Sequence, residues 1–256
     1  VAHTWNNCLP YNVIGTSESQ TILNYNDATT ISTVSDWVTP EYTSSNRNPY
    51  REWIGAQIRA DGWGYGCAGN PELAAEFAYR DACWTHRANG IYGEMMFAAI
   101  IAAAFSVDDP VDLINIGLSE IPENCKLAEA SRRALSEMDQ TKDFYKYMDW
   151  VEAEFGELSG VHTVNNALVV IGALFYGKSD FHQSVCYAIE GGWDTDCNGA
   201  TCGSILGAIH GRSNMNSSLI PPLNDTIKPS VIGFQEITME RLAQRTYEVF
   251  KSIKDS

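Results

Sequence analysis

The stretch from Ala188 to Gly211, AIEGGWDTDCNGATCGSILGAIHG, places two acids in a very flexible part of the backbone. Asp194 and Asp196 are one residue apart, Gly191 and Gly192 precede them, and a helix of small residues is expected to follow. In a tight turn, carboxylates at this spacing can point to one cation, and hard cations such as Mg²⁺ take oxygen ligands. The positive end of the following helix favours anions as well. An alternative, that both acids only cap the helix, fits these residues equally well.

Beyond the acids, glycines recur at every fourth position, at Gly203, Gly207 and Gly211. Residues four apart lie on one face of a helix. We therefore expect a bare stripe there, against which another backbone packs closely.

Helical patterns dominate the rest of the chain. Asn70-Pro71 and Asp109-Pro110 each supply a cap with a first-turn proline, and Ser179 is expected to cap the helix that follows it. Strands of alternating polarity are nearly absent, so the sequence predicts an all-α fold. Residues 1–50, rich in Asn, Thr, Ser and Tyr, are expected to be irregular. The expected helices span residues 72–86, 91–105, 111–121, 126–138, 141–155, 163–177, 180–190 and 238–254.

The composition is that of a globular protein. The chain has 256 residues, of which 45% are hydrophobic and 19% charged, enough for one large core or two small ones. A net charge of -15 argues against nucleic acid as a partner. The apolar run from Met95 to Phe105 is too short to span a bilayer, so no membrane partner is expected. The 7 cysteines include no C-x-x-C pair, which favours reduced thiols and a cytoplasmic location.

The stretch GGWDTDCNGATCGSILGAIHG resembles the C-terminal signature of the ADP-ribosylglycohydrolase family, in which a Gly-Gly-Asp-x-Asp-Thr segment precedes a helix of small residues. Residues 74–105 are similar to the central helix pair of that family, and residues 161–196 to the approach to its last metal motif. Residues 48–65 correspond loosely to its Gly-Ala-Met-Arg loop. The resemblance runs from about residue 48 to residue 211. It implies an ADP-ribosylglycohydrolase-like helical fold, in a single domain over residues 1–256.

The same resemblance assigns a metal site. Asp194 and Asp196 fall on the metal-binding carboxylates of the family, with Mg²⁺ as the implied cofactor. Cys197 stands where many members have a Thr or Ser ligand, and a thiol is a poor ligand for Mg²⁺. Trp193, between the glycines and the first acid, is a further departure, interpreted as a packing residue or an aromatic beside the adenine.

Four residues are implied as contacts of the bound ligand: His86, Asn89, Gly90 and Arg59. His86 matches a ligand-contacting histidine of the family. Backbone amides at Asn89 and Gly90 could meet a diphosphate, and the fork of Arg59 suits phosphate oxygens, although Arg59 could equally be a helix surface charge. For two other residues, His162 and Glu94, we prefer a structural interpretation.

The implied reaction is Mg²⁺-assisted hydrolysis of the glycosidic bond of an ADP-ribosylated protein or small molecule; no catalytic residue is assigned. The family also carries an N-terminal Asp-rich motif, which we do not find among the nearest acids, Glu18, Asp27, Asp36 and Glu41. The chain is therefore expected to be the C-terminal portion of a longer protein, poorly active alone. The alternative is a non-catalytic ADP-ribose-binding or structural relative with the same fold.

Overall fold

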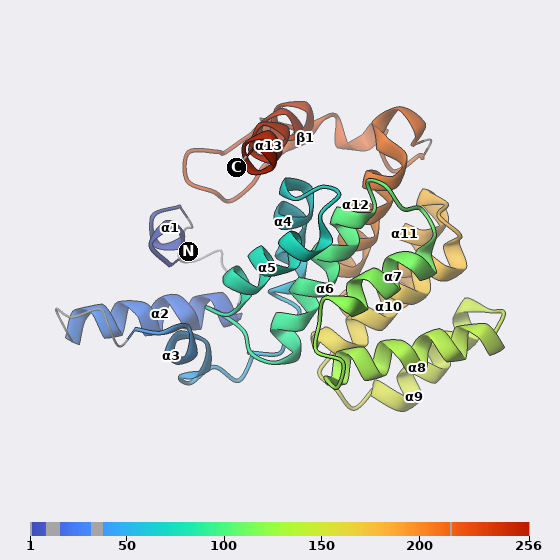
Figure 1. Cartoon of the computed structure of the whole chain (residues 1–256), viewed down its shortest axis with the longest axis horizontal. Helices are drawn as coiled ribbons and strands as arrows, with labels where there is room; N and C mark the ends of the chain where they lie inside the picture. Colours follow the sequence, from blue (N-terminus) through green and yellow to red (C-terminus); the bar gives the residue numbers. More distant parts are fainter. Residues whose placement is uncertain (1, 9–15, 32–37, 216, 256) are drawn as a thin grey trace.

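The computed structural model describes residues 2–8, 16–31, 38–215 and 217–255 (Figure 1). Helix accounts for 68% of the residues and strand for 3%, which confirms the all-α prediction. The elements in chain order are α1 (Ala2–Cys8), α2 (Thr16–Ile31), α3 (Pro40–Ser45), η3 (Gln57–Arg59), α4 (Ala60–Gly66), α5 (Pro71–Ala82), α6 (Asn89–Ala103), α7 (Pro110–Ser119), α8 (Lys126–Gln140), α9 (Phe144–Phe155), α10 (Thr163–Gly177), α11 (Phe181–Glu190), α12 (Thr195–Asn214), η4 (Pro221–Leu223), β1 (Thr226–Ile227), β2 (Ile237–Thr238) and α13 (Met239–Lys254).

Two helices, α6 and α10, form the centre of the core. Both are apolar around most of their circumference and almost entirely buried, as expected for a helix without a polar face. Helices α4, α5 and α7 pack around α6, while α8, α9, α11 and α12 pack around α10. Figure 1 shows this arrangement, with α6 and α10 in the middle of the molecule. The apolar runs read from the sequence therefore mark the inner layer of the fold.

The helix starts follow the expected capping chemistry at two of three positions. The side chain of Asn70 accepts a hydrogen bond from the Leu73 amide at the start of α5. Asp109 accepts bonds from two amides at the start of α7. The prediction for Ser179 is wrong, because Asp180 caps α11. The Ser179 hydroxyl instead donates to the Asp108 carbonyl.

The described part of the first 50 residues is not irregular, and the prediction is wrong there; residues 1, 9–15 and 32–37 lie outside the described residues. Helices α1, α2 and α3 occupy most of the described part of that region. The buried side of α2 carries Ser17, Thr21 and Asn24, whose side chains donate to backbone carbonyls of neighbouring segments, Asn24 to that of Thr43 at 2.9 Å. These residues keep helical spacing, but in polar side chains, so a search for apolar periodicity misses the helix.

The glycine stripe of α12 does not receive another backbone, and this prediction is wrong too. A Cβ at Gly207 or Gly211 would meet no atom within 4 Å, and at Gly203 it would make an ordinary contact with Val185. Gly211 has φ of +64°, a left-handed conformation that kinks the helix. Gly199, outside the stripe, is the residue that packs closely, with its Cβ position 3.2 Å from Ile189.

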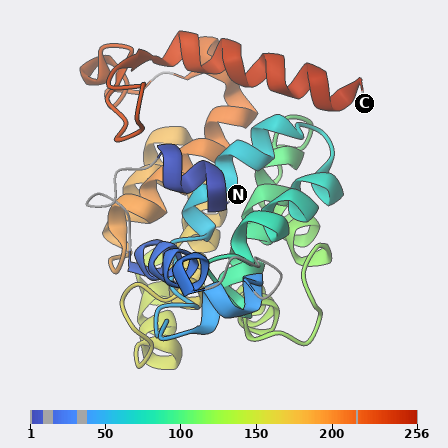
Figure 2. The ribbon, with the colours of Figure 1, turned by 90° about the vertical axis from the view of Figure 1, so that its left-hand side faces the viewer.

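The C-terminal segment lies along one side of the molecule. Strands β1 and β2 pair antiparallel, and α13 follows β2 directly and packs on α4. Figure 2 shows α13 lying across the helical body. None of the described helices carries an apolar stretch long enough to cross a bilayer.

We predict that Gly172→Ala lowers the free energy of unfolding by about 1–3 kcal/mol, the usual effect of overpacking a core. The added Cβ would collide with the ring of Tyr147, which is fully buried between α9 and α10. The matched control is Gly62→Ala in α4, where the new methyl meets no atom within 4 Å. It should stabilise the protein by about 0.5–1 kcal/mol. Urea unfolding of both variants checks the pair, and equal effects would contradict the packing described.

Candidate functional site

The chain turns sharply between α11 and α12. Gly192 and Trp193 have φ of +80° and +52°, a region in which glycine is free of strain. The Asp194 amide donates to Asn166 Oδ1 at 3.0 Å, and Asn198 Nδ2 donates to the same oxygen at 2.9 Å. A single buried amide on α10 therefore holds both ends of the turn in place.

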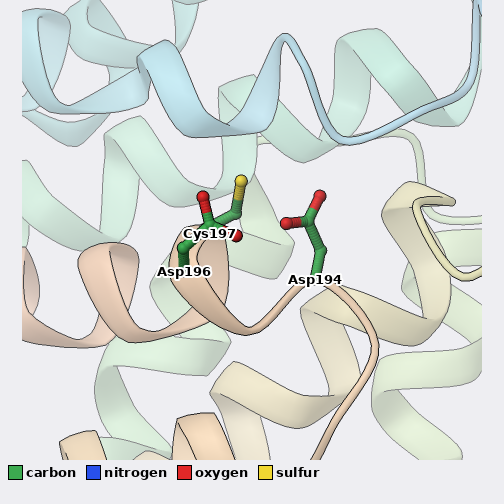
Figure 3. Close-up of side chains that lie close together, drawn as sticks. All are labelled: Asp194, Asp196 and Cys197. Atoms are coloured by element: carbon green, nitrogen blue, oxygen red, sulfur yellow. The ribbon is translucent and has the colours of Figure 1, made fainter.

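Three potential ligand atoms gather at the start of α12. The carboxylates of Asp194 and Asp196 and the Cys197 thiol each offer one atom, and all lie within 4.8 Å of one another. Figure 3 shows the three side chains on the same side of the helix. Asp194 occupies the N-cap position of α12, and Asp196 lies in the first turn of that helix. The Asp194 carboxylate forms no cap hydrogen bond by distance and angle, although the Cys197 N–H lowers its pKa. The cation site at these acids stays a prediction.

The pKa values of Asp194 and Cys197 are raised, mainly by burial. Burial raises the pKa of Asp194, the Asp196 carboxylate adds to this, and Cys197 acts in the opposite direction through its thiol and backbone N–H. Burial, together with both carboxylates, raises the pKa of Cys197 well above its ordinary value. The protonated forms of Asp194 and Cys197 are therefore favoured, and a bound cation would reverse that preference.

A buried amide without a hydrogen-bond partner lies on η3, which packs against α12. Gln57 is 1% exposed, and neither its oxygen nor its nitrogen has a hydrogen-bond partner within the described structure. Its Oε1 lies against α6, 3.2 Å from the position of a Cβ at Gly93. Buried polar atoms almost always have partners, so this amide is an exception inside the core.

Arg59, expected to contact phosphate, is held inside the protein. Burial by itself would lower the pKa of Arg59, but the carboxylates of Glu94, Asp81 and Glu18 outweigh it and raise that pKa. The Glu94 oxygen is 3.6 Å from the guanidinium. With its donors engaged in this way, Arg59 has a structural task, and its contact with a ligand stays a prediction. The guanidinium hydrogen bonds go to Glu18 at 2.6 Å, Asp81 at 2.8 Å, Thr85 at 3.0 Å and the Gly55 carbonyl at 2.9 Å.

His86 lies in the same polar interior. Its ring is fully buried, and Nδ1 is 2.7 Å from the Thr85 hydroxyl. Burial lowers the pKa of His86 well below its usual range, and the Arg59 charge lowers it further. The neutral form therefore prevails at physiological pH. Contact with a ligand stays a prediction for this residue also.

Asn89 and Gly90 begin α6 beneath the segment of Arg51 and Glu52. Asn89 donates to a Glu52 carboxylate oxygen at 2.7 Å and accepts from the Leu127 amide at 3.0 Å. Gly90 fits under the chain, since a Cβ there would lie 2.5 Å from the Arg51 carbonyl oxygen. The amides expected to meet a diphosphate thus already have protein acceptors.

A pocket of about 450 Å³ opens beside Asn89, within the size range of small-molecule sites. Asn89 alone among the four predicted ligand residues lines it. No hydrogen bond or ion pair between described residues connects these four with the Asp194 group. The lining residues are Glu52, Ala88, Asn89, Tyr92, Pro122, Asn124, Cys125 and Lys126.

The structural interpretations of Glu94 and His162 are supported. Glu94 is fully buried and accepts a hydrogen bond from Trp63 Nε1 at 2.8 Å. His162 caps α10, because its Nδ1 accepts from the Val164 amide. Trp193 is half-buried and packs against the hydrophobic core.

Sequence reasoning missed the roles of two acids. Glu18, dismissed because it is not part of a paired motif, reaches the interior as a partner of Arg59. Asp61 on α4 is close to the Ser204 hydroxyl of α12, and burial raises the pKa of Asp61 to about 6. Of the other N-terminal acids, Glu41 forms an exposed ion pair with Arg87. Asp27 and Asp36 lie outside the described side chains.

We predict that Arg59→Leu lowers the free energy of unfolding by about 3–5 kcal/mol, because it leaves buried carboxylates unpaired. Arg59→Lys should recover only part of the loss, since an ammonium cannot reproduce the fork geometry. The control, Arg80→Leu, removes an exposed pair with Glu76 and should cost less than about 1 kcal/mol. Denaturant unfolding measures the free energy of unfolding of each variant, and a decrease for Arg59→Leu as small as that for Arg80→Leu would count against the network.

We predict that the raised pKa of Asp61 makes the stability of the protein depend on pH. Its pKa is about 6 when folded, against 3.8 for the free side chain. Between these values the unfolded chain releases the proton while the folded chain keeps it, so this group reduces stability as pH rises. The advantage of Asp61→Asn over the wild type should thus grow between pH 4 and pH 7, by roughly 1–2 kcal/mol. A constant difference across this range would refute the assignment.

The comparison with known protein families agrees with the all-α fold. A search among curated proteins gives no match to the chain. Residues 2–255, essentially the whole chain, match the family described as ADP-ribosylglycohydrolase. That family is one of hydrolases acting on ADP-ribosyl linkages. The chain belongs to the ADP-ribosylglycohydrolase family.

Proposed function

We propose that this chain hydrolyses the glycosidic bond between an ADP-ribosyl group and a protein side chain or small molecule. Water adds its hydroxyl to the anomeric carbon of the distal ribose, and its proton goes to the leaving group. Family membership over residues 2–255 supports the class of reaction. The observation that carries the proposal is the group formed by Asp194, Asp196 and Cys197. This group lies in the stretch that resembles the C-terminal signature of the family.

The donors at this position suit a divalent cation, with two carboxylate oxygens as ligands. Such a cation, when bound, polarises ribose hydroxyls or water. The protein supplies the positioning, because Asn166 fixes the turn that carries Asp194. The thiol of Cys197 does not suit Mg²⁺, the cation implied by the resemblance.

The pocket beside Asn89 is the best-supported place for part of the ligand. It carries one basic side chain, Lys126, and the exposed polar groups of Glu52 and Asn124. A positive charge matters in a chain of net charge -15, because a diphosphate approaches against the general field. All 7 cysteines are free, which supports a reducing compartment such as the cytoplasm.

A second candidate is a non-catalytic relative that binds ADP-ribose without turnover. It is favoured by the internal engagement of Arg59 and His86 and by the lack of an assigned acid–base residue among the described positions. The two candidates differ in one measurable respect. Both bind ADP-ribose, but only the hydrolase releases it from a conjugate.

We predict that the chain releases free ADP-ribose from ADP-ribosylated peptides, measured by liquid chromatography with added divalent cation, and that the rate is low, as expected above for the chain alone. Asp194→Asn and Asp196→Asn should each reduce the rate by at least roughly tenfold to a hundredfold through loss of cation affinity. Asp139→Asn, an exposed acid at the end of α8, is the control and should have no effect. Calorimetric binding of ADP-ribose without release from any conjugate would favour the non-catalytic candidate. Absence of both binding and release would reject the proposal.

A further inference from the structure

We propose that the group of Asp194, Asp196 and Cys197 selects a divalent cation that accepts sulfur, of the zinc class, over Mg²⁺. The inference rests on the proposed function only in placing the cation at that group. It concerns the identity of the cation, which neither the fold nor the family membership determines. Cys197 is thereby the residue that sets cation preference.

The geometry places all three donors around one position. Their ligand atoms lie within 4.8 Å of one another and point to the same side of α12 (Figure 3). Zinc bonds of about 2.0–2.3 Å put tetrahedral ligand atoms about 3.5 Å apart. Small rotations about the side-chain torsions bring the three atoms to that separation. The Cys197 thiol is thus close enough to both carboxylates to be the third ligand of one cation.

The surroundings of the two acids favour a cation. No ion pair between described residues neutralises Asp194 or Asp196, although the two carboxylates are close together. The Cys197 thiol lies within the same 4.8 Å, so a cation that binds both carboxylates meets sulfur as well as oxygen.

The chemistry of sulfur decides the preference. Mg²⁺ is a hard cation that dehydrates reluctantly and takes oxygen ligands, so the thiol contributes little to its binding. Zn²⁺ and Co²⁺ accept mixed oxygen and sulfur ligands in a tetrahedral site. A hydroxyl at position 197 would leave only hard donors, which do not discriminate against Mg²⁺. Replacing the sulfur should therefore weaken the binding of Zn²⁺ and change the binding of Mg²⁺ little.

The test uses Co²⁺ as a spectroscopic probe with the metal-free full chain. Wild type should give a sulfur-to-cobalt charge-transfer band that saturates at one equivalent. Zn²⁺ should abolish it at stoichiometric concentration, and Mg²⁺ should fail to do so even at on the order of a thousandfold excess. Cys197→Ser and Cys197→Thr should both lose the band and bind Zn²⁺ at least roughly tenfold more weakly. Circular dichroism verifies that these variants are folded.

The control is Cys186→Ser, a half-buried cysteine on α11 outside the group, which should keep the band. A band that persists in folded Cys197→Ser, no band in wild type, or displacement of Co²⁺ by equimolar Mg²⁺ would each overturn the inference. Calorimetry with ADP-ribose on the same samples separates the two proposals. ADP-ribose binding and release without a sulfur band reject only the cation preference, whereas a sulfur band without either rejects only the proposed function.

Discussion

The partly buried charge of Arg59, paired with buried carboxylates, is the interaction on which the N-terminal half of the fold depends. Its guanidinium contacts acids from three separate helices, Glu18 of α2, Asp81 of α5 and Glu94 of α6. Removing such charges from water is costly, and only mutual pairing with good hydrogen bonds offsets the cost. The three helices can therefore move relative to η3 only by breaking charged contacts. Because η3 also lies against α12, the network connects the N-terminal helices with the helix that carries Asp196 and Cys197.

The sequence predicted the inner part of the fold well, for physical reasons. Helices α6 and α10 are apolar on nearly all sides, and that signal is local to each segment. The caps at Asn70 and Asp109 are equally local, since each side chain bonds to amides two or three residues further on. The prediction failed for α2 because most of its buried residues are polar. Their partners, such as Thr43 and Thr85, are distant in sequence and leave no trace in the local pattern.

The same distinction explains the candidate site. Asp194 and Asp196 could be singled out because their donors come from one short stretch of chain. Arg59 was assigned to a ligand on the character of its side chain alone. Its acidic hydrogen-bond partners in the structure are 22 and 41 residues away, and no spacing rule connects them with Arg59. His86 is similar, since only the fold reveals that its ring is buried beside Thr85 and Arg59. The pocket beside Asn89 likewise combines residues from separate segments.

The turn before α12 also limits how the site can vary. Three donors come from four consecutive residues, and Asn166 fixes the backbone through bonds to Asp194 and Asn198. The left-handed conformations at Gly192 and Trp193 leave little freedom for the backbone to adjust. Separation between the ligand atoms is thus set by the fold, whereas their chemistry is set by the side chains. A single exchange of oxygen for sulfur at position 197 can therefore change which cation binds without altering the architecture around it.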